Sequence, residues 1–110
     1  MSNLAQNQRT SVRKPLNTRG TLVAGSHTIP FAAQDIGTNG VCVVVASPIN
    51  IGQRCHIDLV LIARGSQYDI AAVAKVTYCV ACREGFRVGL NFVDMINKVN
   101  LNAIALFMES

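Results

Sequence analysis

Residues 54–61, Arg-Cys-His-Ile-Asp-Leu-Val-Leu, decide the fold class of this chain. Apolar residues occupy every second position from Cys55 to Leu61, and polar residues stand between most of them. This alternation is typical of a β-strand with one buried face and one face in water. Residues 70–80 and 86–92 alternate in the same way, while residues 41–46 are apolar on both faces, as in a central strand.

The segments around these strands complete the predicted fold. Turn-forming residues separate the strands at residues 37–40, 48–52, 63–66 and 83–85, and two weaker strands are expected at 18–24 and 27–33. Near the C-terminus the apolar residues recur at helical spacing, with Asn97 or Asn100 expected to cap the start of the helix. The sequence therefore predicts an all-β fold, a six-stranded antiparallel β-barrel with one C-terminal α-helix.

The charges of the chain are distributed unevenly. The chain has 110 residues, enough for one domain, and a net charge of +4. The first 34 residues carry four basic and no acidic side chains, whereas the remaining 76 carry six of each. We expect residues 1–15 to form a flexible basic N-terminal segment and residues 16–110 to form the barrel domain with its helix. The asymmetry points to an anionic partner.

Two short motifs lie in and just after the basic region. Arg9 and Arg13 form the pattern RxxxR, and Asp35-Ile-Gly-Thr-Asn-Gly40 begins 22 residues after Arg13. With the six-strand pattern, these motifs resemble the PilZ domain family, whose hallmarks are RxxxR and [D/N]xSxxG. The resemblance extends from residue 9 to about residue 108. It implies a receptor for cyclic di-GMP, a bacterial second messenger.

The resemblance also implies which residues bind the ligand. Guanidinium groups donate to guanine O6 and N7, stack on bases and pair with phosphates. Asp35 is suited to accept from the N1–H and N2 amino group of guanine, and Lys14 is a further phosphate partner. The expected ligand-binding residues are Arg9, Arg13, Lys14, Asp35, Gly37 and Gly40.

One position departs from the family motif. Gly37 stands where the family has serine, while Gly40 allows either a close backbone approach or a positive φ in the turn. The missing hydroxyl is expected to weaken binding by roughly 1.5–3 kcal/mol. This departure keeps open the alternative of a degenerate PilZ-type interaction scaffold that binds no nucleotide.

The sequence also contains a tyrosine and four cysteines with more than one interpretation. Tyr78 shares its predicted strand face with Val76 and Val80, which favours a core position over a base-stacking platform. Cys79 and Cys82 form a CxxC at the end of a strand, which is a poor setting for redox chemistry and half of a zinc ligand set at most. The remaining thiols are interpreted as small core residues. We therefore expect no metal and no cofactor other than the bound ligand.

The residue patterns exclude most enzyme classes. The six carboxylates form no evident acid–base pair, and no nucleophile elbow or phosphate loop is present. We expect a binding protein, not an enzyme. The N-terminus lacks the pattern of a signal peptide and no apolar run is long enough to span a membrane, so the expected location is the cytoplasm.

The expected function is that of a cyclic di-GMP receptor and adaptor. A single domain of this size acts by contacting an effector protein that the sequence does not identify, and motility, attachment or biofilm outputs follow from the resemblance alone. The second alternative is a small basic barrel that binds single-stranded nucleic acid. It is disfavoured because the chain has only six aromatic residues, with Phe86, Phe92 and Tyr78 on apolar faces.

Overall fold

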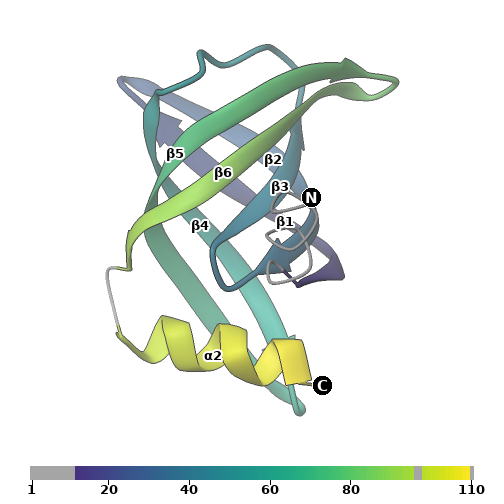
Figure 1. The fold of residues 1–110 in the computed structure, drawn as a ribbon, viewed down its shortest axis with the longest axis vertical. Coiled ribbons are helices and arrows are strands. Elements are labelled where there is room, and N and C mark those ends of the chain that lie inside the picture. The colour runs from purple at the N-terminus through teal and green to yellow at the C-terminus, as the bar shows by residue number, and fades with distance from the viewer. Residues whose placement is uncertain (1–11, 96–97, 110) are drawn as a thin grey trace, which may run out of the picture.

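Figure 1 presents the fold in a computed structural model that describes residues 12–95 and 98–109. The described residues form six strands and one helix. In chain order these are β1 (Arg13–Ala24), β2 (His27–Gly37), β3 (Gly40–Val45), β4 (Arg54–Ala63), β5 (Ser66–Cys82), β6 (Gly85–Met95) and α2 (Lys98–Glu109).

The strands form one closed antiparallel barrel in the order β1-β2-β3-β6-β5-β4. Closure depends on β1 and β4, which pair from Gly20 opposite Leu59 to Val23 opposite His56. The helix α2 lies across one end of the barrel (Figure 1). This confirms the predicted six-stranded antiparallel barrel with a C-terminal helix. None of the helical residues that the structure describes forms a segment long and apolar enough to cross a membrane.

The core fills the inside of the barrel. Along β4, the alternate residues Cys55, Ile57, Leu59 and Leu61 are buried, as the sequence pattern predicts. Ile104 and Ala103 of α2 close the core at the end of the barrel. Because apolar side chains point inward at every second position of a strand, the residues between them lie on the outer face of the barrel.

Asn100 fixes the helix to the barrel and does not cap it. The residue lies inside α2 and is buried. Its Oδ1 accepts the backbone N–H of Ala71 at 2.8 Å, and its Nδ2 donates to the carbonyl of Asp69 at 2.9 Å. β6 pairs with β5 only from Ala72 onward, so the side chain satisfies backbone groups beyond that pairing. Asn97, the other predicted cap, lies outside the described residues.

β1 and β2 both extend further than the sequence indicates. β1 begins at Arg13, so the predicted boundary at residue 15 falls inside a strand. β2 continues to Gly37, so Asp35 belongs to a strand, and the connection to β3 is only residues 38–39. These strand ends are rich in polar residues, so the alternation of apolar residues does not identify them. Their pairing brings the two sequence motifs together.

Candidate functional site

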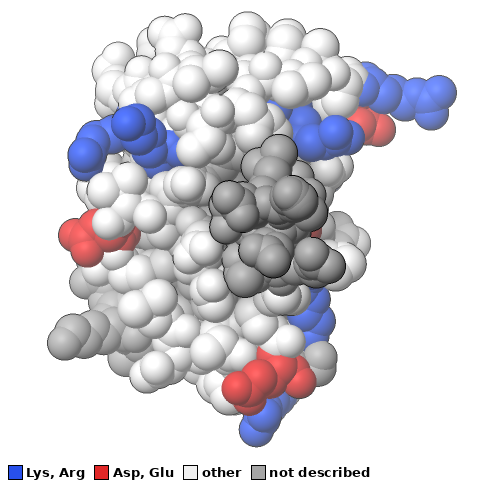
Figure 2. Space-filling view, in the orientation of Figure 1, with Lys and Arg blue, Asp and Glu red and all other residues white. Residues whose placement is uncertain are grey.

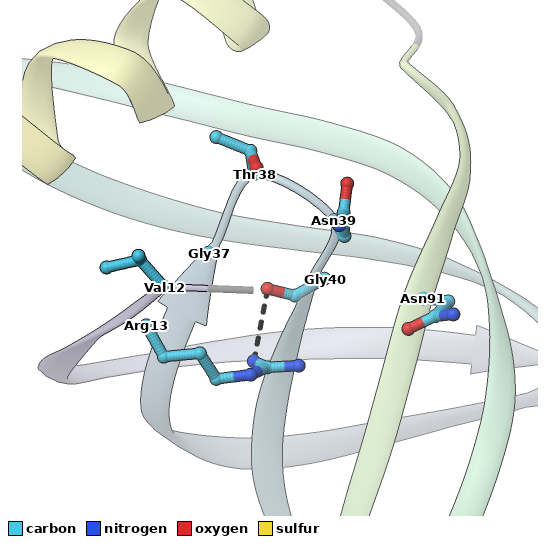
Figure 3. A pocket seen from close by; sticks show the side chains of 7 residues that line it. All are labelled: Val12, Arg13, Gly37, Thr38, Asn39, Gly40 and Asn91. Carbon is cyan, nitrogen blue, oxygen red and sulfur yellow. Dashed lines mark hydrogen bonds between the residues drawn. The ribbon is translucent and has the colours of Figure 1, made fainter. Parts of the chain in front are cut away.

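The two motifs meet because β1 and β2 pair along their ends. Arg13 lies opposite Gly37, and Pro15 lies opposite Asp35. Arg13 Nη1 donates to Asp35 Oδ1 at 2.9 Å. The same nitrogen donates to the carbonyl oxygen of Gly40 at 3.4 Å (Figure 3). The side chains of Arg13 and Asp35 are 37% and 35% exposed, so the ion pair contributes at most about 1 kcal/mol to stability. An accessible pair of this kind remains available to a ligand.

A pocket of about 120 Å³ lies beside this ion pair. Figure 3 shows Arg13 extending along the pocket toward the Gly40 carbonyl, with Asn91 on the facing strand. The pocket is lined by Val12, Arg13, Gly37, Thr38, Asn39, Gly40 and Asn91. Its polar groups are a guanidinium, two amides, a hydroxyl and backbone atoms, which suit a ligand with both donors and acceptors.

Both glycines of the motif are required by close backbone contacts. A Cβ added to Gly37 would lie 2.7 Å from the carbonyl oxygen of Val12, and one added to Gly40 would collide with the carbonyl oxygen of Leu90. Gly40 therefore allows β3 to approach β6, and Gly37 allows the start of β1 to approach β2. Both contacts shape the pocket wall.

The structure brings together four of the six predicted residues. Arg13, Asp35, Gly37 and Gly40 lie around the pocket and its ion pair. Lys14 instead donates from Nζ to the carbonyl oxygen of Phe107 at 2.8 Å and lies 4.7 Å from the centre of that ring, at the C-terminal end of α2. Cations are favoured there because the last carbonyls of a helix lack backbone partners. Arg9 lies outside the described residues.

Asn91 is a site residue that the sequence interpretation missed. It lies directly opposite Gly40 in the β3–β6 pairing and lines the pocket. The alternation of residues 86–92 in the sequence already places Asn91 on the outer face, between buried Leu90 and partly buried Phe92. Only the strand order reveals that this position adjoins the Asp35 motif, because β6 is distant from it in the sequence.

Tyr78 lies on the outer face of the barrel, and its predicted core position is wrong. The side chain is 37% exposed. Val76 pairs with Leu90 and Tyr78 pairs with Gly89, so β5 advances two residues while β6 advances one. This bulge at Thr77 reverses the inside–outside alternation for the rest of β5.

The ring of Tyr78 extends across three strands. It lies over Gly89 of β6, where an added Cβ would collide with the ring, and its hydroxyl donates to Cys42 Sγ of β3 at 3.3 Å. Burial of the side chain, which is the larger cause, and the hydrogen bond to Cys42 together raise the pKa of Tyr78 to about 12. The charges of Arg13 and Asp35 also act on this hydroxyl, in opposite directions. Tyr78 is therefore a protonated, outward-facing ring beside the ion pair.

The cysteines have structural positions. Cys55 belongs to the core, as predicted, and burial raises the pKa of its thiol. Cys42 is buried but lies outside the core cluster, under the Tyr78 hydroxyl. Cys79 and Cys82 are free thiols three residues apart on β5, which places them on opposite faces of the strand. Within the part of the chain that the structure describes, no three potential metal ligands come together.

The described residues thus form a closed barrel with a polar pocket on its outer face, where two strand ends meet. The sequence profile of the PilZ domain matches residues 7–110, and the chain belongs to the PilZ domain family. This is a family of cyclic di-GMP receptor and adaptor domains. A comparison with curated proteins finds no match.

Solved structures share the fold of this chain at low sequence identity. The Bacillus subtilis inhibitor of motility, MotI/DgrA, is 15% identical with a TM-score of 0.78, over 92% of this chain and 50% of that one. The PilZ domain with c-di-GMP of YcgR from Escherichia coli is 14% identical with a TM-score of 0.66, over 93% of this chain and 89% of that one. The PilZ domain of CeSA from a cellulose synthesizing bacterium is 14% identical with a TM-score of 0.55, over 86% of this chain and 92% of that one. This chain therefore matches half of the length of MotI/DgrA.

Proposed function

We propose that this protein binds cyclic di-GMP on the outer face of the barrel and thereby regulates a partner protein. The observation that supports this most strongly is the contact of Arg13 with both Asp35 and the Gly40 carbonyl beside the pocket. These residues belong to two motifs that are 22 positions apart in the sequence and meet only in the folded chain. The proposed role is binding and not catalysis.

The chemistry of the pocket matches a guanine nucleotide. Asp35 accepts two hydrogen bonds from the N1–H and N2 amino edge of guanine, and Arg13 pairs with a phosphate or with guanine O6 and N7. The exposed ring of Tyr78 offers a surface for base stacking near the ion pair. We propose that Arg9 adds further donors from the basic segment, as the family motif implies.

Regulation of a partner follows from ordering of the N-terminal segment around the ligand. A basic segment that closes over an anionic ligand changes both the charge and the shape of the surface. A partner protein that recognises only the closed surface then responds to the ligand, and we propose that this occurs in the cytoplasm. The scaffold alternative differs because partner binding would not depend on the nucleotide.

Isothermal titration calorimetry with cyclic di-GMP tests the proposal. We expect saturable binding to the wild-type protein and a loss of about ten- to a hundredfold in affinity for both Arg13→Gln and Asp35→Asn, because each removes a charge-assisted hydrogen bond. Arg64→Gln is the matched control, since Arg64 also forms an exposed ion pair, with Glu109 at 3.3 Å, away from the pocket. Absence of heat at tens of micromolar wild-type protein would reject the nucleotide receptor in favour of the scaffold.

A further inference from the structure

The pocket is too small to hold a cyclic dinucleotide by itself. Its volume is about 120 Å³, whereas pockets that enclose drug-sized ligands measure about 300–1,000 Å³. A ligand anchored at Arg13 and Asp35 must therefore extend over the outer face of the barrel. The side chains on that face therefore determine where a phosphodiester group of the ligand lies outside the pocket.

A row of paired residues leads from the pocket across the barrel. Gly40 lies opposite Asn91, Asn91 lies opposite Lys75, and Lys75 lies opposite Arg54. Paired residues of neighbouring strands point to the same face, and strands are about 4.8 Å apart. Arg54, Lys75 and Asn91 are all exposed. Lys75 is thus one strand away from the pocket residue Asn91, and Arg54, two strands away, is about 10 Å from Asn91.

The pairing of Arg54 with Lys75 places two cations directly opposite each other. Neither belongs to the two ion pairs that join described residues, which are Arg13 with Asp35 and Arg64 with Glu109. Like charges at directly opposed positions destabilise a sheet. Figure 2 shows basic side chains at the upper left of the molecule, with an acidic side chain below them. An anion between the two side chains would relieve the repulsion.

We propose that Lys75 and Arg54 form a second anion subsite that takes a phosphodiester group of the ligand whose guanine end lies at Arg13 and Asp35. This inference rests on the proposed function, and it assigns the direction in which the ligand leaves the pocket. Asn91 lies between the two subsites and contributes an amide to the same row. The Lys75 ammonium and the Arg54 guanidinium reach from neighbouring strands toward one group, which suits a charge-assisted contact.

Binding of cyclic di-GMP to Lys75→Gln and Arg54→Gln tests this subsite. We expect each variant to lose about five- to tenfold in affinity and to show a weaker dependence of affinity on salt, because a phosphate contact is removed. Lys75→Arg keeps the charge that pairs with the phosphate and should bind within about twofold of the wild type. Arg83→Gln is the matched control, since it removes one exposed positive charge in the β5–β6 turn, outside the row.

Thermal unfolding of the same ligand-free variants provides a second readout. Removing either member of the opposed pair should raise the melting temperature by about 1–4 °C, because the repulsion is lost, whereas Arg83→Gln should leave it unchanged. If the wild type binds and the Lys75 and Arg54 variants match Arg83→Gln, the subsite is refuted and the proposed function stands. If the wild type gives no binding, the proposed function fails and the subsite fails with it.

Discussion

β3 and β4 belong to the same barrel, but their outer faces differ. On β4 the residues alternate strictly between core and water, so that Leu61 is fully buried and Ile62 is 65% exposed. On β3 every residue from Gly40 to Val45 is buried, although only Val41, Val43 and Val45 belong to the core cluster. The outward residue Cys42 is covered by Tyr78, whose ring reaches it from β5.

This difference separates the part of the barrel that maintains the fold from the part that offers a site. Only the inner face of β4 is buried, so apolar and mostly polar residues alternate along its sequence. β3 has a second layer on its outside, made by Tyr78 together with the ion pair of Arg13 and Asp35. Polar and aromatic side chains gathered over a buried strand are the setting in which a ligand finds both packing and hydrogen bonds.

The largest effect is expected from the inner face of β4. Leu61→Ala should lower the free energy of unfolding by about 2–5 kcal/mol, because it leaves a cavity in the core. Ile62→Ala, at the next residue on the outer face, should change it by less than about 0.5 kcal/mol. Urea unfolding monitored by circular dichroism measures both values. Similar losses for the two variants would mean that the outer face of β4 is also packed.

A smaller effect is expected where the Tyr78 ring crosses β6. Gly89→Ala should cost about 1 kcal/mol, because its new methyl group occupies the position of the ring and forces it to move. In a Tyr78→Ala background the same change should cost nothing. A double-mutant cycle from urea unfolding measures this coupling between the two residues. Equal costs in both backgrounds would show that the ring does not lie on Gly89.

The third prediction concerns the departure from the family motif. Gly37→Ser restores the family's hydroxyl but places a Cβ 2.7 Å from the carbonyl oxygen of Val12. We therefore expect the affinity for cyclic di-GMP to change by less than about tenfold, or 1.4 kcal/mol, since the start of β1 must shift. Gly37→Ala adds the Cβ without the hydroxyl and should bind more weakly than Gly37→Ser. If calorimetry found tenfold tighter binding for Gly37→Ser, the start of β1 would be able to shift without a loss of free energy.

The fourth prediction concerns the titration of Tyr78. Its pKa of about 12 lies above the ordinary value of 10.0, so packing stabilises the folded state below pH 10, and this stabilisation is lost as the pH rises through 12. The absorbance of phenolate near 295 nm, taken as the difference between the wild type and Tyr78→Phe, measures the ionisation. A midpoint near pH 10 would contradict the contact between the hydroxyl and Cys42.

The sequence predicts the barrel better than it predicts the site. The alternation of apolar and polar residues in β4 and β6 identifies their inner faces, because every second residue is buried and therefore apolar. Tyr78 is misplaced because the bulge at Thr77 reverses that alternation, and a bulge depends on the pairing partner. Asn91 is missed because its neighbour Gly40 is distant along the chain. The motif residues Arg13, Asp35 and Gly40 were identified through family resemblance, and the strand pairing explains why they meet.

Backbone NMR shifts measured with and without cyclic di-GMP test the central claim most directly. The expected changes concentrate on the outer layer over β3, at Arg13, residues 35–42, Tyr78, Gly89 and Asn91, while residues 56–63 of β4 remain unchanged. Absence of shifts at saturating ligand, or shifts confined to β4 and α2, would contradict a receptor site on this face.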